Sequence, residues 1–176
     1  VIEFLKECLP PIDSDIAKRL RKQLEKKGVK FYLQAGVKRI ENGNVTFERK
    51  GKEETILADT VLIATGRAAN IEGLGLEAAG IEVDRKGIVV DEHFCTNVKN
   101  IYAIGDVNGE QMLAHAAEFQ GYHVLNQILG HSDHINFQIM PSAVFTNPEI
   151  AGVGLTEDQC KEQGLNYKCF KSLYRA

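Results

Sequence analysis

The stretch that decides the fold is residues 101–115, Ile-Tyr-Ala-Ile-Gly-Asp-Val-Asn-Gly-Glu-Gln-Met-Leu-Ala-His. Its first four residues are mostly β-branched or aromatic, which predicts a short strand. Gly105 and Asp106 end that strand, and a helix is expected to begin at about Met112. Open α/β sheets bind nucleotide-type ligands where the carboxyl end of a strand faces a helix N-terminus. An ionised carboxylate only accepts hydrogen bonds, so Asp106 is a candidate partner for ligand hydroxyls.

The first third of the chain predicts a strand, a helix and a second strand. Residues 1–5 and 29–33 are apolar enough for strands. A helix is expected to begin at Asp13 or Ser14, since either residue suits the N-cap position. Gly28 suits the position just after a helix, so the helix is expected to end there.

An antiparallel meander is predicted next. Asn42-Gly43 lies between strand-like runs, and both positions of a two-residue hairpin turn need positive φ. Residues 37–41 and 45–48 would be its strands, and 54–57 a third. The apolar run 59–64 is short enough for a buried strand and too short for a core helix.

The second half predicts one long helix followed by a strand-rich segment. Residues 67–80 are rich in glycine and predict a crossing segment between domains. Thr156-x-x-Gln159 has the spacing of a capping box, which predicts a short helix that ends at Gly164. The other expected elements are strands at 87–91, 143–145, 150–153 and 167–170 and a helix over 112–129.

Composition excludes several classes of protein. The net charge is −3 among 176 residues, which argues against a nucleic-acid partner, and no apolar run is long enough to cross a membrane. Four cysteines are scattered, which favours a reducing, cytoplasmic location with unpaired thiols, although a disulfide between two of them stays open. His131 and His134 have a spacing that can share a metal, but the polar loop offers no further ligand, so no metal site is predicted.

Five segments of the chain resemble the pyridine nucleotide–disulfide oxidoreductases, and within that family the dihydrolipoamide dehydrogenases most. The matching segments are Val1-Ile2-Glu3, Ala64-Thr65-Gly66-Arg67, Ile101 to Asp106, Met112 to His115, and Pro141 to Gly154. The resemblance implies an α/β protein in three parts. Residues 1–66 would be the distal half of a Rossmann-like NAD-binding domain with its meander. Residues 67–136 would be the second segment of a Rossmann-like FAD-binding domain. Residues 137–176 would begin an α+β dimerisation, or interface, domain of a longer protein.

The same resemblance assigns cofactor-binding residues. Glu3 would bond the adenosine ribose of NAD and repel a 2′-phosphate, and Val37 would lie by the adenine. Asp106 would bind the ribityl chain of FAD, and the start of the long helix would face the pyrimidine edge of the flavin. The full expected set is Glu3, Val37, Gly66, Arg67, Gly105, Asp106, Met112, Leu113, Ala114 and His115. Read alone, Glu3 and Val37 are ordinary strand residues, and His115 can equally be a packing residue.

The family's catalytic groups are not found in this sequence. It has no paired redox cysteines, no G-x-G-x-x-G and no His-x-x-x-x-Glu, so no catalytic residue is predicted and the chain alone is expected to be inactive. The parent would oxidise a protein-bound dihydrolipoyl dithiol and pass hydride through FAD to NAD. Its expected partners are a second copy, as a homodimer, and the lipoyl domains of 2-oxoacid dehydrogenase or glycine cleavage complexes. The alternatives are a mercuric or glutathione reductase-like enzyme and a non-enzymatic nucleotide-binding module.

Overall fold

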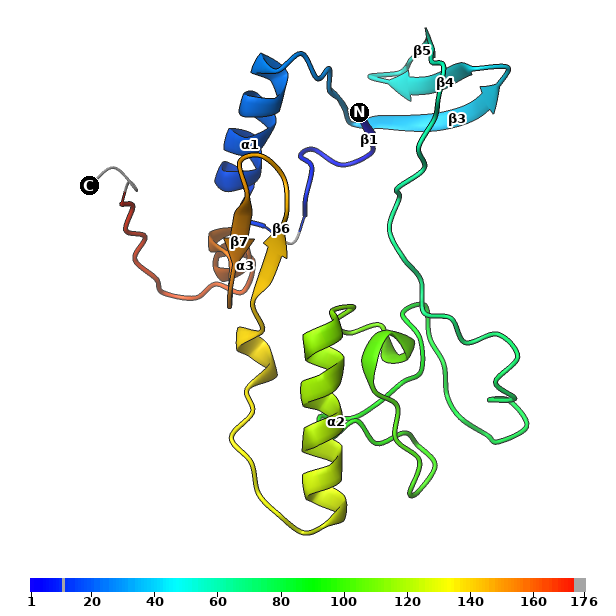
Figure 1. The fold of residues 1–176 in the computed structure, drawn as a ribbon, viewed down its shortest axis with the longest axis vertical. Helices are drawn as coiled ribbons and strands as arrows, with labels where there is room; N and C mark the ends of the chain where they lie inside the picture. Colours follow the sequence, from blue (N-terminus) through cyan, green and yellow to red (C-terminus); the bar gives the residue numbers. More distant parts are fainter. Residues whose placement is uncertain (11, 173–176) are drawn as a thin grey trace. The chain divides into compact units, whose positions relative to one another are not determined.

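The computed structural model describes residues 1–10 and 12–172 (Figure 1). The chain forms two compact units, which are described separately. The first unit contains residues 1–63 and the residues from 141 onward, and the second contains residues 64–140. The three-part division expected from the sequence stays a prediction.

A parallel strand pair with a helix between its strands opens the first unit. Strand β1 (Ile2–Glu3) pairs with β2 (Tyr32–Leu33), and helix α1 (Ser14–Lys26) connects them. The helix buries Ala17 and Leu20, the middle of its apolar stripe. The predicted strand–helix–strand order is confirmed, with shorter strands than expected.

The predicted meander is also confirmed. Strands β3 (Ala35–Glu41), β4 (Asn44–Arg49) and β5 (Lys52–Leu57) form an antiparallel sheet in that order. Asn42 and Gly43 have φ angles of 48° and 77°, as a two-residue hairpin turn requires. Phe47 in the central strand is fully buried, and its ring centroid lies 5.0 Å from that of Tyr32.

The strand predicted over residues 59–64 is wrong. These residues form no strand, and the side chains of Leu62 and Ile63 are 86% and 70% exposed. An apolar run becomes a buried strand only where other strands pair with it, because its backbone N–H and C=O groups need partners. Within the described residues no strand pairs with this run.

Three other predicted strands are also absent from the described part of the chain. Residues 87–91 and 101–104 form only isolated bridges, Val83 with Ile88 and Cys95 with Tyr102, and residues 167–170 form none. Phe94 and Ala103 are nevertheless joined by a backbone hydrogen bond of 3.0 Å. The local sequence of the three segments favours an extended backbone, but a strand also needs a neighbouring strand to complete its hydrogen bonds.

The second unit is built around one long helix. Helix α2 (Ala114–Ile128) begins at Ala114 rather than at Met112, because Leu113 is extended and occupies the N-cap position. A 3-10 helix, η1 (Gly105–Asn108), precedes α2, and η2 (Phe137–Ile139) follows it. The helix buries Ala116, Gln120 and Val124.

The segment after residue 140 returns to the first unit. Strands β6 (Ser142–Val144) and β7 (Ile150–Gly152) form an antiparallel pair, followed by helix α3 (Glu157–Glu162). Thr156 and Gln159 make both hydrogen bonds of the predicted capping box. The two strand predictions and the helix prediction are confirmed to within one residue at most ends.

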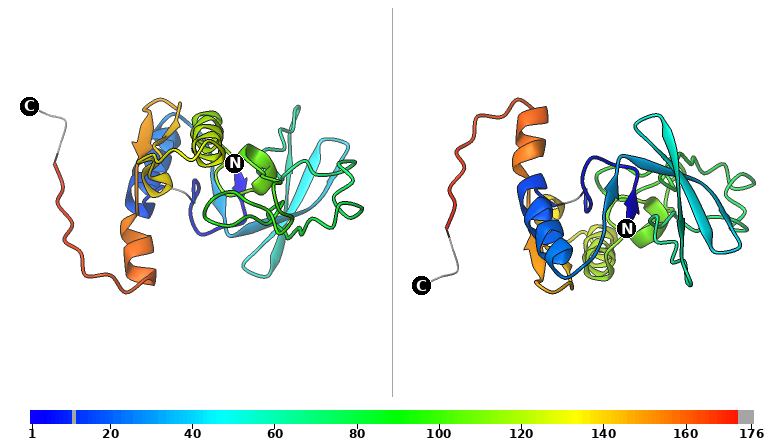
Figure 2. Two further views of the ribbon diagram at one scale, coloured as in Figure 1. Left: turned by 90° about the horizontal axis from the view of Figure 1, so that it is seen from below. Right: turned by 90° about the horizontal axis from the view of Figure 1, so that it is seen from above.

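Two hydrogen bonds join the N-termini of α1 and α3. In each bond a backbone N–H of one helix donates to a carboxylate at the start of the other. Asp13 precedes α1, yet its carboxylate accepts from the backbone N–H of Glu157 in α3 at 2.6 Å. In return, Asp158 of α3 accepts from the backbone N–H of Ser14 in α1 at 3.1 Å. Figure 2 shows α1 beside α3 and the β6–β7 pair in both views. This exchange joins segments far apart in the sequence.

The hydrogen bonds between Ser14 and Asp158 favour the ionised form of the Asp158 carboxylate. Hydrogen bonds from the Ser14 side chain and backbone N–H hold the pKa of Asp158 below its ordinary value of 3.8. A carboxyl whose folded pKa is lowered stabilises the fold above its unfolded pKa. This contribution is therefore lost as the pH falls below about 4 toward the lowered pKa.

None of the helices in the described residues is long and apolar enough to span a membrane.

All four cysteines are free: Cys8, Cys95 and Cys160 are partly exposed and Cys169 is exposed. The unpaired state of these thiols agrees with the scattered positions of the cysteines in the sequence.

We predict that Asp158→Ala will loosen the first turn of α1. The Ser14 N–H loses its acceptor, and a single hydrogen bond is worth about 1 kcal/mol. Hydrogen–deuterium exchange at the start of α1 should therefore accelerate about fivefold. Glu162→Ala, at the opposite end of α3, is the control. If hydrogen–deuterium exchange at Ser14 is unchanged in Asp158→Ala, the Asp158 carboxylate does not stabilise the start of α1.

Candidate cofactor-binding site

The turn that carries Asp106 is fastened to α2 by one buried side chain. Gln120 is 1% exposed, and its carbonyl oxygen accepts from the Gly105 N–H at 2.7 Å and from the Asn108 amide at 3.1 Å. The same Asn108 amide also donates to the carbonyl of Ala103 at 3.1 Å. These bonds satisfy buried polar groups and fix η1 against the helix.

Two glycines allow this turn to pack closely. Gly105 has φ 74°, and a Cβ built there would lie 3.1 Å from the Cβ of Ala117 in α2. Gly109 has φ 68°, and a Cβ there would lie 2.2 Å from the carbonyl oxygen of Lys86. The motif therefore needs glycine at both positions, for backbone conformation and for space.

Arg67 brings the separate predicted stretches of the second unit together. One guanidinium nitrogen lies 3.8 Å from a carboxylate oxygen of Asp106, and another donates to the backbone carbonyl of Met112. The Arg67 and Asp106 side chains are 65% and 53% exposed. Asp106 thus combines a fixed backbone with a carboxylate that is open to a ligand.

The N-terminus of α2 completes this arrangement. Within the described residues, Leu113 makes no side-chain cap bond to the helix. The first N–H groups of any α-helix lack partners inside the helix, and they carry about half a positive charge. Ala114 and His115 form this first turn, which can favour an electron-rich group. Gly66 has φ 110° and open space at its Cβ position.

Glu3 and Val37 lie in the first unit. A carboxylate oxygen of Glu3 accepts from the backbone N–H of Leu5 at 2.8 Å, so the chain bends sharply after β1. Val37 is 47% exposed and lies next to an irregularity in the pairing of β3 with β4. The structure therefore divides the predicted residues between two units, and it describes each group by itself.

Sequence reasoning missed Gln120 and Asn108 as supporting residues. A usable signal was present, because Gln120 occurs between Ala116 and Val124 at the four-residue spacing of a buried helix face. A polar residue at such a position must find a hydrogen-bond partner, and the nearby turn supplies it.

A second polar cluster holds the other end of α2. His123 Nδ1 lies 3.0 Å from a carboxylate oxygen of Asp133, and its ring contacts Phe94 and Phe137 edge-on. The hydrogen bond from His123 lowers the pKa of Asp133. This cluster fastens the loop after α2 to the helix. Among the described residues there is no group of three His, Cys, Asp or Glu side chains able to hold a metal, so His131 and His134 have no third ligand.

Comparisons with known proteins identify the family of this chain. The model of the pyridine nucleotide-disulphide oxidoreductase family matches residues 1–121, and the model of its dimerisation domain matches residues 140–176. Leghemoglobin reductase of Glycine max is 42% identical over 97% of this chain and 34% of its own length. The mitochondrial dihydrolipoyl dehydrogenase of Pisum sativum is 41% identical over the whole chain and 36% of its own length. The dihydrolipoyl dehydrogenase of Bacillus subtilis is also 41% identical, over 39% of its length.

Solved structures give the same result. LpdA from Mycobacterium tuberculosis superposes with a TM-score of 0.79 at 29% identity, covering 93% of this chain and 36% of that chain. The HOCl-induced flavoprotein disulfide reductase RclA from Escherichia coli superposes with a TM-score of 0.74 at 32% identity, covering 93% and 38%. The chain thus spans less than two fifths of the length of these relatives. The family predicted from the sequence is confirmed, and its members use FAD and NAD(H). The chain belongs to the pyridine nucleotide–disulphide oxidoreductase family and has its α/β fold.

Proposed function

We propose that this chain is part of an FAD-dependent dihydrolipoyl dehydrogenase, which oxidises a protein-bound dihydrolipoyl dithiol and passes hydride to NAD. The observation that carries the proposal is the half-exposed Asp106 carboxylate on a turn fixed by Gln120, beside the N-terminus of α2. The curated relatives named above as dihydrolipoyl dehydrogenases support the choice within the family.

The residues of the second unit fit FAD. Ligand hydroxyls need an acceptor, and Asp106 supplies a carboxylate whose backbone is already fixed. An electron-rich ring needs donors or positive charge, and the first turn of α2 supplies both. Bound FAD would supply the two-electron chemistry between the dithiol and NAD.

Each residue of the proposed flavin site has a physical role. Asp106 would accept hydrogen bonds from the ribityl hydroxyls, and Arg67 would hold Asp106 near Met112. Leu113, Ala114 and His115 would present the helix N-terminus to the ring. A helix terminus stabilises nearby negative charge by about 0.3–1 kcal/mol when exposed and by up to about 2 when partly buried. Gly66 would let the ligand approach the backbone closely, and Gly105 lets α2 pack closely against the turn.

The first unit would contribute to the NAD site. Glu3 would accept from the ribose hydroxyls of the adenosine half, and Val37 would offer an apolar surface to the adenine. The bend held by the Glu3–Leu5 hydrogen bond keeps the carboxylate near the end of β1. In the proposed division, residues 1–66 belong to the NAD domain, 67–136 to the FAD domain and 137–176 to the dimerisation domain.

The match to a dimerisation domain supports a homodimer as the proposed assembly. The lipoyl domains of 2-oxoacid dehydrogenase or glycine cleavage complexes are the proposed macromolecular substrates. A cytoplasmic location is also a proposal, because the relatives named above include a mitochondrial protein.

Another disulfide reductase is the second candidate, and the likeness to RclA favours it. The intact enzyme that contains this chain separates the two candidates in a steady-state assay. Rapid NAD reduction with dihydrolipoamide supports the dehydrogenase. Activity confined to NAD(P)H-dependent disulfide reduction would favour the reductase.

We predict that Asp106→Ala in the intact enzyme will weaken FAD binding, because ligand hydroxyls lose their acceptor. The expected cost is about 1–3 kcal/mol. Flavin release during dialysis, followed by absorbance, measures it. Glu118→Ala is the matched control, because it removes an exposed carboxylate of α2 that lies outside the proposed site. Equal flavin retention in Asp106→Ala and the parent would exclude Asp106 from the site.

Gln120→Leu should loosen the turn without touching the ligand. It leaves the buried Gly105 N–H and Asn108 amide without their shared acceptor, at a cost of about 1–3 kcal/mol. We expect a lower unfolding temperature and faster flavin release. Glu118→Leu, an exposed residue of the same helix, should change neither quantity. An unchanged melting temperature for Gln120→Leu would show that this bond does not hold the turn.

The Glu3 carboxylate should determine which dinucleotide the intact enzyme prefers. NADH should be preferred to NADPH, because the added phosphate would meet the Glu3 carboxylate and like charges repel. Glu3→Gln should lower the ratio of kcat/KM for NADH to kcat/KM for NADPH. A parent enzyme that prefers NADPH would remove Glu3 from the proposed NAD site.

A further inference from the structure

We propose that Phe4 forms an aromatic platform for the adenine of the bound dinucleotide. The inference rests on the proposed NAD site at Glu3 and adds a residue that the sequence did not single out. It concerns the first unit alone, in which Phe4, Glu3 and Val37 all lie.

Phe4 lies between the two residues proposed to bind the adenosine half. It directly follows Glu3, and its ring atom Cδ2 lies 3.6 Å from the Cβ position of Gly36. Gly36 directly precedes Val37. The ring therefore extends from the end of β1 to the start of β3.

The exposure of the ring leaves room for a ligand. Phe4 is 76% exposed although part of its ring packs on Gly36. Many apolar side chains of this chain are exposed, so exposure alone indicates nothing. Phe4 differs because it directly follows Glu3, the residue proposed to bind the ribose, and its ring lies against Gly36, which precedes Val37. Purine bases stack on such rings because every base has a π face.

Hydrogen bonds hold the backbone on either side of the ring. The Leu5 N–H donates to Glu3, and the Leu5 carbonyl accepts from the Gln34 N–H at 3.0 Å. The second bond ties the loop to the residue that separates β2 from β3. Phe4 is thus placed by its own backbone and by the neighbouring strands.

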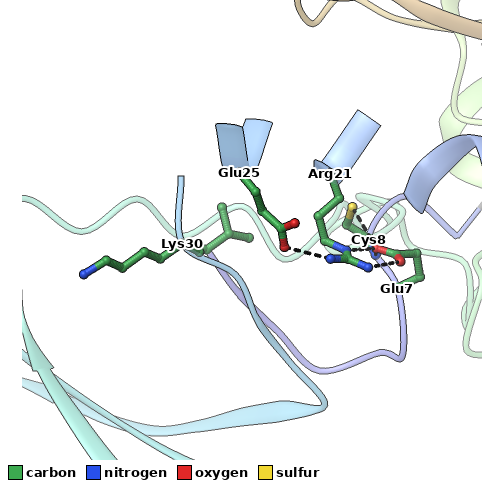
Figure 3. A network of polar contacts seen from close by, with 6 residues as sticks. Glu7, Cys8, Arg21, Glu25 and Lys30 are labelled. Carbon is green, nitrogen blue, oxygen red and sulfur yellow. Dashed lines mark hydrogen bonds and ion pairs between the residues drawn. The ribbon is translucent and has the colours of Figure 1, made fainter. Parts of the chain in front are cut away.

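A partly buried ion pair fixes the far end of the same loop (Figure 3). Both carboxylate oxygens of Glu7 accept from the Arg21 guanidinium in α1, at 2.8 and 3.0 Å, and Arg21 also contacts Glu25 at 2.7 Å. The Arg21 hydrogen bond lowers the pKa of Glu7, and burial raises the pKa of the adjacent Cys8 thiol, so Glu7 is ionised and Cys8 neutral at pH 7. A loop held at both ends loses little freedom when a ligand binds, which favours affinity.

The test measures binding directly, with the intact enzyme that contains this chain. ADP-ribose carries the adenine and its ribose, whereas nicotinamide mononucleotide carries neither. Isothermal titration gives the Kd of both probes for the parent, Phe4→Ala and Phe4→Tyr. Leu74→Ala, an exposed apolar residue of the second unit, is the control.

Phe4→Ala should weaken ADP-ribose binding about tenfold, the lower half of the range for one base–aromatic stack. Binding of nicotinamide mononucleotide should stay unchanged, Phe4→Tyr should restore ADP-ribose affinity, and the KM for NADH should rise without a change in kcat. Equal ADP-ribose affinity in Phe4→Ala and the parent overturns the platform and leaves the NAD site intact. A parent that fails to bind ADP-ribose overturns the proposed NAD function itself. If Phe4→Ala does not fold, Phe4→Leu keeps the bulk and removes the π face, and the same criteria apply to it.

Discussion

The second unit depends on one buried carbonyl oxygen, that of Gln120. It accepts from the Gly105 N–H and from the Asn108 amide, so a single side chain of α2 sets the path of the turn. A buried donor without an acceptor costs about 1–3 kcal/mol, which makes any other path of the turn less stable. These bonds fix the backbone around Asp106, and its exposed carboxylate lies 3.8 Å from the Arg67 guanidinium. Rigid support and an open ligand group therefore come from different residues.

In the first unit, two carboxylates exchanged between helices have a comparable effect. Asp13 and Asp158 each accept a hydrogen bond from a backbone N–H of the other's helix, so the N-termini of α1 and α3 lie next to each other. The contact does not require a large apolar surface, and α3 is short and has no buried residues. Ile12 adds an apolar contact, because its side chain lies near Gly152 of β7. These hydrogen bonds thus join the segment after residue 140 to the start of α1, which lies 144 residues earlier in the sequence.

Sequence reasoning succeeded where structure is decided locally. The hairpin at Asn42-Gly43 needs two residues that tolerate positive φ, and the capping box needs only Thr156 and Gln159. It failed at residues 59–64 and 101–104, whose composition suits strands. A strand also needs neighbours that complete its hydrogen bonds, and sequence pattern alone does not say whether they are there. Asp13 shows the same limit, since its helix was predicted correctly but its carboxylate bonds to another helix.

The candidate site follows the same division. The order of Gly105, Asp106 and α2 could be predicted, because the motif is one continuous stretch, although α2 begins two residues later than expected. The contact of Arg67 with Asp106 and Met112 could not, since it depends on how a distant loop returns to the turn. The Arg67 guanidinium places a positive charge beside the Asp106 carboxylate, whose side chain is 53% exposed and therefore accessible to a ligand. The proposed flavin site therefore combines an acceptor for hydroxyls with a helix terminus for negative charge, and Arg67 keeps the two next to each other.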